Sequence, residues 1–135
     1  MKYLKGFNDV EKFQIYLDDL RTPVDFENWI IVRNYDNFVE KIVEIGLDSI
    51  SRISLDHDLA DFRFEDGEEI EKTGYDAAKF LVDYFLDNNF SSFPMVTVHS
   101  DNNVGSLNIV TYVNNFLKWK GFTPNCVREK ISHTV

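Results

Sequence analysis

The chain shows two hydrophobic periods that follow one another along the sequence. Apolar and polar residues alternate over residues 13–17, and this period of two predicts a β-strand. Three further runs rich in apolar and β-branched residues predict strands over residues 29–33, 52–59 and 95–99. A less regular run predicts a fifth strand over residues 123–131.

The segments between these strands carry apolar residues at intervals of three and four, which is the helical period. The first predicted helix has Asp36 as its N-cap and stops at Gly46. The second opens at Thr73 and ends near residues 88–89, and the third covers residues 103–120. Strands that alternate with helices predict a doubly wound α/β fold, with a mainly parallel five-stranded sheet and helices on both faces.

Ionisable and polar side chains gather where the predicted strands end. Asp18 and Asp19 close the first strand, Asp56-His57-Asp58 interrupts the third, and His99-Ser100 closes the fourth. In a parallel sheet the carboxyl ends of the strands share one edge, and ligands bind there. We therefore expect these side chains to form one site.

Composition narrows the class of protein. The length of 135 residues and a hydrophobic content of 44% predict a single folded domain over residues 1–135. The net charge of −9 disfavours binding to long nucleic acid but leaves room for a small phosphate ligand held by focused arginines. No apolar run approaches the roughly 18 residues of a membrane helix, and the single cysteine, Cys126, excludes an internal disulfide. These features favour a cytoplasmic protein without membrane contact, and they leave its oligomeric state open.

Residues 61–72 carry much of the negative charge. We interpret this stretch as a solvated loop, and the alternative is a lid over the site.

Three of the acids have the character of a Mg²⁺ site. Asp18 and Asp19 at the end of the first strand, with Asp56 from the third, would offer the hard oxygen ligands that Mg²⁺ prefers. The alternative is that Asp18 or Asp19 caps the turn that follows. The sequence leaves metal binding and capping about equally favoured.

Two histidines at strand ends suggest acid–base chemistry. His57 and His99 could deprotonate a water and protonate a leaving oxygen, with Asp56 or Asp58 to orient an imidazole. The alternative is a structural edge in which His57 bonds Asp58. His133 is expected at the surface.

Several residues are candidates for phosphate binding. Arg21 and Arg33 follow strands at the same edge, and a guanidinium offers a planar fork to phosphate oxygens, although either could instead pair with the surplus carboxylates. Ser100 and Asn102 precede a predicted helix, whose N-terminus attracts anions. Gly105 would let a ligand approach that first turn, and simple capping by an asparagine is compatible with this.

Four short motifs occur in order and carry a family resemblance. They are Leu-Asp-Asp-Leu-Arg-Thr-Pro at 17–23, Ser-Leu-Asp-His-Asp-Leu at 54–59, Thr-Gly-Tyr-Asp at 73–76, and His-Ser-Asp-Asn-Asn-Val-Gly at 99–105. With these motifs the chain resembles, over roughly residues 15–117, the cyclic-phosphate-processing receiver-like domains of bacteria and phages.

The resemblance implies a receiver fold and assigns roles to several residues. Asp18 and Asp19 would match the receiver acid pair that holds Mg²⁺, and Asp56 would match the phospho-accepting aspartate. Ser100 would match the hydroxyl position after the fourth strand. The chain departs from ordinary receivers in its added histidines and in lacking a clear match for the usual lysine, for which Lys130 is a candidate.

Together these features predict a phosphodiesterase that opens a cyclic phosphate or a cyclic (oligo)nucleotide. His57, His99, Asp56 and Asp58 would act in catalysis, and Arg21, Arg33, Ser100 and Asn102 would bind the phosphate. A phage origin would suggest destruction of a host nucleotide signal. The alternatives are a sponge that binds a nucleotide without cleaving it, and a receiver that is phosphorylated on Asp56.

Overall fold

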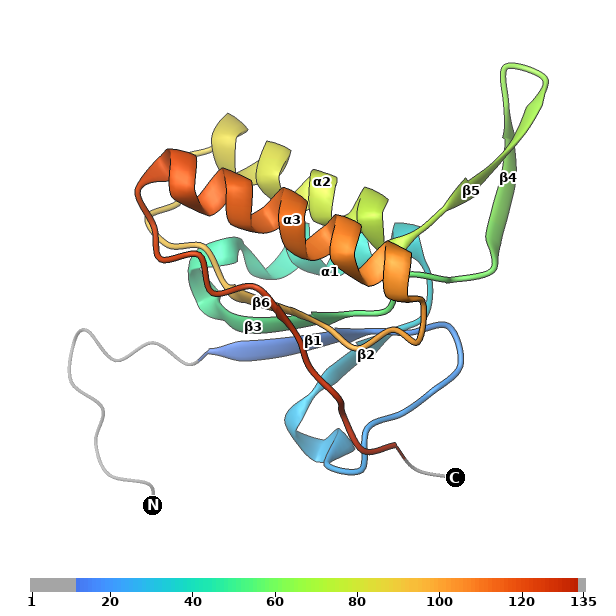
Figure 1. Ribbon diagram of the computed structural model, residues 1–135, viewed down its shortest axis with the longest axis horizontal. Coiled ribbons are helices and arrows are strands. Elements are labelled where there is room, and N and C mark those ends of the chain that lie inside the picture. The colour runs from blue at the N-terminus through green and yellow to red at the C-terminus, as the bar shows by residue number, and fades with distance from the viewer. Residues whose placement is uncertain (1–11, 134–135) are drawn as a thin grey trace.

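A five-stranded parallel sheet forms the centre of the molecule (Figure 1). The computed structural model describes residues 12–133, so the first eleven and the last two residues of the predicted domain lie outside the described part. All neighbouring strands pair in parallel, in the order β2-β1-β3-β6-β7. The strands are β1 (Phe13–Leu17), β2 (Ile30–Val32), β3 (Ile50–Leu55), β6 (Met95–Val98) and β7 (Val127–Arg128). The predicted receiver-like α/β class is therefore confirmed.

The helical cover is unequal on the two faces of the sheet. The helices α1 (Tyr35–Ile45), α2 (Gly74–Asp87) and α3 (Asn103–Lys120) pack side by side on one face (Figure 1). The chain crosses from β2 to β3, β6 and β7 in one direction, and right-handed connections then put all three helices on the same side. The step from β1 to β2 runs the opposite way and leaves only the 3₁₀ helix η1 (Phe26–Asn28) for the other face. The predicted α-helices on both faces are therefore not found in the described part of the chain, because a short connection replaces a helix between β1 and β2. A second 3₁₀ helix, η2 (Leu47–Ser49), leads into β3.

The central strands bury side chains on both faces. Ile15, Ile53 and Val96 belong to the hydrophobic core, which α1 to α3 complete. The next positions along the strands are Tyr16, Ser54 and Thr97, which are adjacent in the sheet and equally buried. Because side chains alternate across a strand, this second row occupies the face without α-helices. The sheet thus has an apolar face and a partly polar one.

The acidic stretch predicted as a loop is instead a β-hairpin. Strands β4 (Asp61–Glu65) and β5 (Glu68–Lys72) pair antiparallel, and the hairpin projects from the body of the molecule (Figure 1). Its turn, Asp66-Gly67, has φ values of 53° and 81°. Two positive φ values match the tight turn that an Asp-Gly pair favours. The Asp66-Gly67 turn was not predicted from the sequence, because the many acidic residues around it favoured a solvated loop.

Several predicted boundaries are wrong by a few residues. The third strand ends at Leu55, which leaves residues 56–59 beyond the sheet, and β7 has only two residues where 123–131 was expected. The N-cap of α1 is Asn34, whose side chain accepts a hydrogen bond from the Asn37 amide, and not Asp36. None of the described helices is long and apolar enough to cross a membrane.

Candidate functional site

The buried row of Tyr16, Ser54 and Thr97 continues beyond the carboxyl ends of the strands as a row of ionisable residues. Asp18, Asp56 and His99 each lie two residues beyond a member of the row Tyr16, Ser54 and Thr97. Backbone bonds extend the ladder at these positions, because the Asp56 amide donates to the Leu17 carbonyl at 2.9 Å and the His99 amide to the Leu55 carbonyl at 2.9 Å. Strand periodicity therefore brings two carboxylates and an imidazole to one edge, which we call the carboxyl rim.

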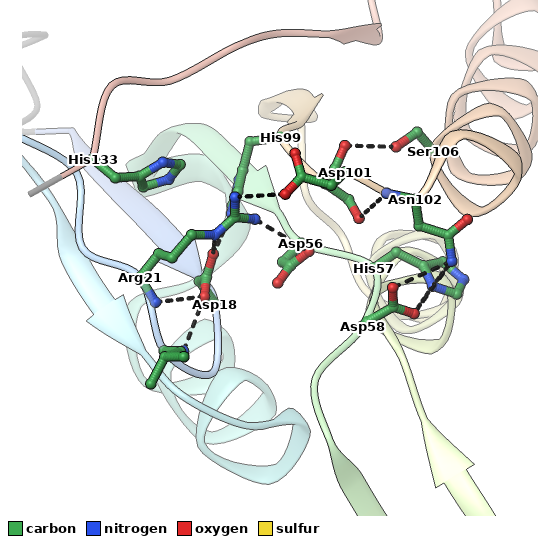
Figure 2. A network of polar contacts seen from close by, with 12 residues as sticks. Asp18, Arg21, Asp56, His57, Asp58, His99, Asp101, Asn102, Ser106 and His133 are labelled. Atoms are coloured by element: carbon green, nitrogen blue, oxygen red, sulfur yellow. Dashed lines mark hydrogen bonds and ion pairs between the residues drawn. The ribbon is translucent and has the colours of Figure 1, made fainter. Parts of the chain in front are cut away.

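Asp18 follows β1 in the carboxyl rim, beside Arg21 (Figure 2), and is fully buried. Its Oδ1 accepts from the amides of Leu20 at 2.9 Å and Arg21 at 2.7 Å. Its Oδ2 accepts from Arg21 Nε at 3.1 Å and lies 3.0 Å from His99 Nε2. Burial alone would raise the pKa of Asp18, but the hydrogen bonds from His99 and the two amides outweigh it and hold this pKa well below its usual range. Asp18 thus caps the turn after β1 and also belongs to the site.

Asp56 is the second buried carboxylate of the carboxyl rim. Burial and the negative charge of Asp18 raise its pKa, against the opposing effects of His99, a hydrogen bond with Ser100, and Arg21. Arg21 Nη2 lies 3.7 Å from Asp56 Oδ1, so one guanidinium serves both buried acids. Two such carboxylates together favour a cation between them.

The donor set fits a hard divalent ion. One carboxylate oxygen from each of Asp18, Asp19 and Asp56 lies within 4.8 Å of the others. Asp19 is exposed, and oxygen ligands of this kind suit Mg²⁺. A divalent charge here would also offset the repulsion that raises the pKa of Asp56.

A cavity of about 230 Å³ opens at these carboxylates. Among its described lining residues, a single guanidinium faces five acids: Asp18, Asp19, Asp56, Asp58 and Asp101, with Arg21 as the cation. A phosphate anion entering this cavity would meet net negative charge, which a bound divalent cation would offset.

A second cavity of about 370 Å³ adjoins the first across Ser100 and Asp101. It is lined by His99 and by the segment Arg128-Glu129-Lys130 after β7. Arg128 Nη2 donates to the Ser100 carbonyl at 2.7 Å. Arg128 was not predicted as a site residue, because the fifth strand was predicted to run to residue 131, whereas β7 ends at Arg128.

His57, Asp58 and Asn102 form a separate cluster beside the acids (Figure 2). His57 Nδ1 lies 2.8 Å from Asp58 Oδ1, and Asn102 Nδ2 donates to both oxygens of Asp58 at 3.3 Å. The bond with His57 and then the one from Asn102 lower the pKa of Asp58. The His57 side chain is 17% exposed, and its Nε2 has no hydrogen-bond partner among the described residues.

The His57 ring packs against the start of α3. A Cβ at Gly105 would lie 2.5 Å from two atoms of that ring. The space that was expected to admit a ligand is therefore filled by His57. Asn102 is the N-cap of α3, since its Oδ1 accepts from the Gly105 amide at 2.8 Å.

His99 has different surroundings from His57. Its Nδ1 lies 2.7 Å from Ser54 Oγ, its Nε2 faces Asp18, and its ring stacks on Tyr16 with centroids 4.3 Å apart. The side chain is 0% exposed. Among the described residues, His57 and His99 have no hydrogen-bond partner in common, so the structure does not bring them together as a facing pair.

His133, expected at the surface, is half-buried next to His99. Its Nε2 contacts the Tyr16 hydroxyl, and its ring centroid lies 5.8 Å from that of His99. The surface prediction was wrong because the segment after β7 returns across the polar face of the sheet (Figure 1).

Two other predicted phosphate ligands are engaged within the protein. Arg33 donates to the carbonyls of Asp18 at 3.2 Å and Arg21 at 2.7 Å, and to Thr22 Oγ1 at 2.8 Å. It therefore braces the connection that carries Arg21. Ser100 is buried, and its Oγ accepts from the Asn102 amide at 3.1 Å.

Comparison with known proteins identifies a family for most of the chain. Residues 13–115 match the family described as Cyclic-phosphate processing Receiver domain. Searches of curated proteins and of solved structures gave no match. The matched region runs from β1 into α3 and contains all the site residues predicted from the sequence, whereas Arg128 and His133 lie beyond it. The chain therefore belongs to the cyclic-phosphate processing receiver domain family.

Proposed function

We propose that this domain hydrolyses the phosphodiester of a small cyclic phosphate or cyclic nucleotide at the carboxyl rim. The observation that carries the proposal is the acid-lined cavity that adjoins an oriented histidine–aspartate pair. A receiver that is only phosphorylated needs the metal-binding carboxylates, but phosphorylation does not need an acid–base group such as His57, whose Nδ1 lies 2.8 Å from Asp58 Oδ1. The family's association with cyclic-phosphate processing supports the same substrate class.

In this proposal Asp19 and Asp56 supply the free oxygens for Mg²⁺, with Asp18 beside them. Each oxygen of Asp18 already accepts two hydrogen bonds, so Asp18 mainly positions Arg21 and the turn after β1. A bound Mg²⁺ would neutralise the cavity and polarise a phosphoryl oxygen. Arg21, 31% exposed and already between the two buried acids, is placed to bind another phosphate oxygen.

His57 is the proposed general acid–base group. With Nδ1–H donated to Asp58, its Nε2 is left to take a proton from water or give one to the leaving oxygen. Asn102 holds Asp58 from the other side and so acts as a positioning residue. His99, buried with both ring nitrogens engaged, acts through Asp18 and not on the substrate.

The test is a panel of nucleoside 2′,3′-cyclic phosphates and cyclic di- and trinucleotides, assayed with and without Mg²⁺. We expect turnover of at least one member, and a loss of about 100-fold or more in kcat for His57→Gln. Asp58→Asn should show a smaller loss, with KM little changed. No turnover by the wild type, or full turnover by His57→Gln, would contradict the proposal. Intact ligand recovered from a heat-denatured complex would instead identify a nucleotide sponge.

A phosphorylated receiver is the second candidate, and one observation favours it. Lys130 lines the cavity next to Ser100, close to where a receiver lysine would be needed. Incubation with a small acyl-phosphate donor should then add one phosphoryl group to the wild type and none to Asp56→Asn. An unchanged intact mass of the wild type would count against this function.

A further inference from the structure

A second group of potential metal ligands lies next to the acid-lined cavity. Asp18, His99 and His133 each offer one ligand atom, and these atoms lie within 4.8 Å of one another. Two imidazoles with one carboxylate suit Zn²⁺ and similar first-row ions, whereas Mg²⁺ prefers oxygen ligands alone. We propose that Asp18, His99 and His133 form a binding site for a late first-row divalent ion such as Zn²⁺, separate in chemistry from the Asp18-Asp19-Asp56 set.

Backbone contacts hold His133 in place. The Val24 amide donates to the Ser132 carbonyl at 2.9 Å, and Pro23 and His133 form an antiparallel bridge. At the other end of the same segment, the Glu129 amide donates to the Val98 carbonyl at 2.8 Å. The segment is thus tied both to the sheet and to the β1–β2 connection, which brings His133 to the polar face. Because His133 lies outside residues 13–115, this ligand is an addition to the matched family region.

Both imidazoles have the outer partners that metal-binding histidines use. The Ser54 hydroxyl lies 2.7 Å from His99 Nδ1, and it can accept a hydrogen bond from that nitrogen. With the proton on Nδ1, His99 Nε2, which contacts Asp18 Oδ2 at 3.0 Å, would bind the ion in place of that contact. The Tyr16 hydroxyl contacts His133 Nε2 and orients the second ring. Such contacts fix the ring and the tautomer of a metal ligand.

Metal binding needs an unprotonated imidazole and an ionised carboxylate. The ion would therefore replace the proton between His99 Nε2 and Asp18 Oδ2, which lie 3.0 Å apart, and that proton would be released to solvent.

The inference does not depend on the proposed hydrolysis, since metal binding is measured on the protein alone. The untagged full chain, stripped with a chelator, is titrated with Co²⁺, a Zn²⁺ surrogate whose visible absorption reports imidazole ligation. We expect one Co²⁺ per chain with visible absorption that excess Zn²⁺ removes. His133→Ala should weaken this binding by at least about tenfold.

Two matched variants separate this site from its neighbours. His57→Gln removes the third histidine of the chain, and Asp19→Asn disables only the oxygen-rich set, so both should keep the Co²⁺ spectrum. Thermal unfolding of metal-free His133→Ala checks that the fold is intact. An unchanged spectrum and affinity in His133→Ala would overturn the inference, as would colourless binding that Asp19→Asn abolishes.

Discussion

Two glycines position the Asp56-His57-Asp58 segment. A Cβ at Gly74 would lie 2.0 Å from the Asp56 carbonyl oxygen, and one at Gly105 would lie 2.5 Å from the His57 ring. Such distances are far inside van der Waals contact, so these positions need the absence of a side chain. The motif glycines therefore serve packing: they let the starts of α2 and α3 close on the segment that carries the proposed acid–base group.

Gly105→Ala is expected to destabilise the protein by about 1–3 kcal/mol, because the new methyl group forces the His57 ring to move. In an ordinary helix the same change would stabilise by up to about 1 kcal/mol. The free energy of unfolding in urea measures the effect. The double variant His57→Ala/Gly105→Ala removes the ring that clashes, so there the alanine should be tolerated. Stabilisation by Gly105→Ala in the wild-type background would show that His57 does not occupy this space.

Asp56→Asn is expected to stabilise the metal-free protein at pH 7. The pKa of Asp56 is raised in the folded state, so its carboxyl contributes most stability below its unfolded pKa of about 3.9 and loses that contribution as pH rises through the folded pKa. The advantage of the variant should therefore shrink as pH falls from 7 towards 4. Urea unfolding across this range, without divalent ions, provides the measurement.

Asp18→Asn is the matched control, with the opposite sign. The pKa of Asp18 is lowered in the folded state, so its stabilising contribution is present at pH 7 and is lost only in strong acid. This variant should lose about 2–3 kcal/mol at pH 7, the usual worth of hydrogen bonds to a charged group. Equal effects of the two variants would contradict the assigned electrostatics.

At the level of secondary structure, the starts of α2 and α3 lie beside the carboxyl rim, whereas the β4–β5 hairpin projects away from it. Both α2 and α3 begin next to residues 56–58: the Gly74 amide donates to the His57 carbonyl at 2.8 Å, and Asn102 caps α3. The positive ends of two helices help this edge to hold ionised carboxylates. The hairpin is different, because its Phe62 and Phe64 are 60% and 73% exposed and it adds no residue to the core.

Replacing residues 62–71 by Asn-Gly, which joins the paired Asp61 and Lys72 through a short turn, should leave the fold intact. We expect the free energy of unfolding to fall by about 2 kcal/mol or less, since the main losses are the ion pairs of Arg63 with Asp61 at 2.9 Å and with Asp36 at 3.1 Å. Urea unfolding is the measurement. A loss of cooperative unfolding would show that the hairpin is part of the core. The same variant tests the lid, because loss of a lid would raise KM for the substrate.

At the scale of the whole molecule, negative charge and site chemistry are coupled. The chain carries a net charge of −9, and five of its acids line one cavity. Folding therefore concentrates charge that the unfolded chain keeps apart. A divalent cation bound there would stabilise the native state by mass action, beyond general screening.

Mg²⁺ is expected to raise the Tm of the wild type more than NaCl does at equal ionic strength. At a concentration 100 times its Kd, one bound ion adds about 2.7 kcal/mol. Asp19→Asn should keep the NaCl effect and lose most of the additional Mg²⁺ effect, because Asp19 is a ligand of the oxygen-rich set alone. Thermal unfolding followed by circular dichroism measures both. Identical shifts in the two salts would rule out a specific site.

Features that depend on residues close together in the sequence could be predicted, and features that depend on distant residues could not. Periods of two and of three to four are local, so β1, α2 and α3 and the topology they imply could be predicted, with Asp18, Asp56 and His99 at one edge. The hairpin was missed because its acidic composition masked a turn signal.

The local hydrophobic pattern was sufficient to predict the parallel α/β sheet and the edge at which the polar residues gather, because strand periodicity and right-handed crossovers follow from local patterns. Which side chains contact one another depends on tertiary packing. In the folded protein His57 contacts Asp58, and His99 contacts Asp18 and Ser54. Arg33 donates hydrogen bonds within the protein, and His133 lies beside His99. Most of these contacts join residues far apart in the sequence, as Asp18 and His99 are by 81 positions, and they depend on packing that no local pattern records.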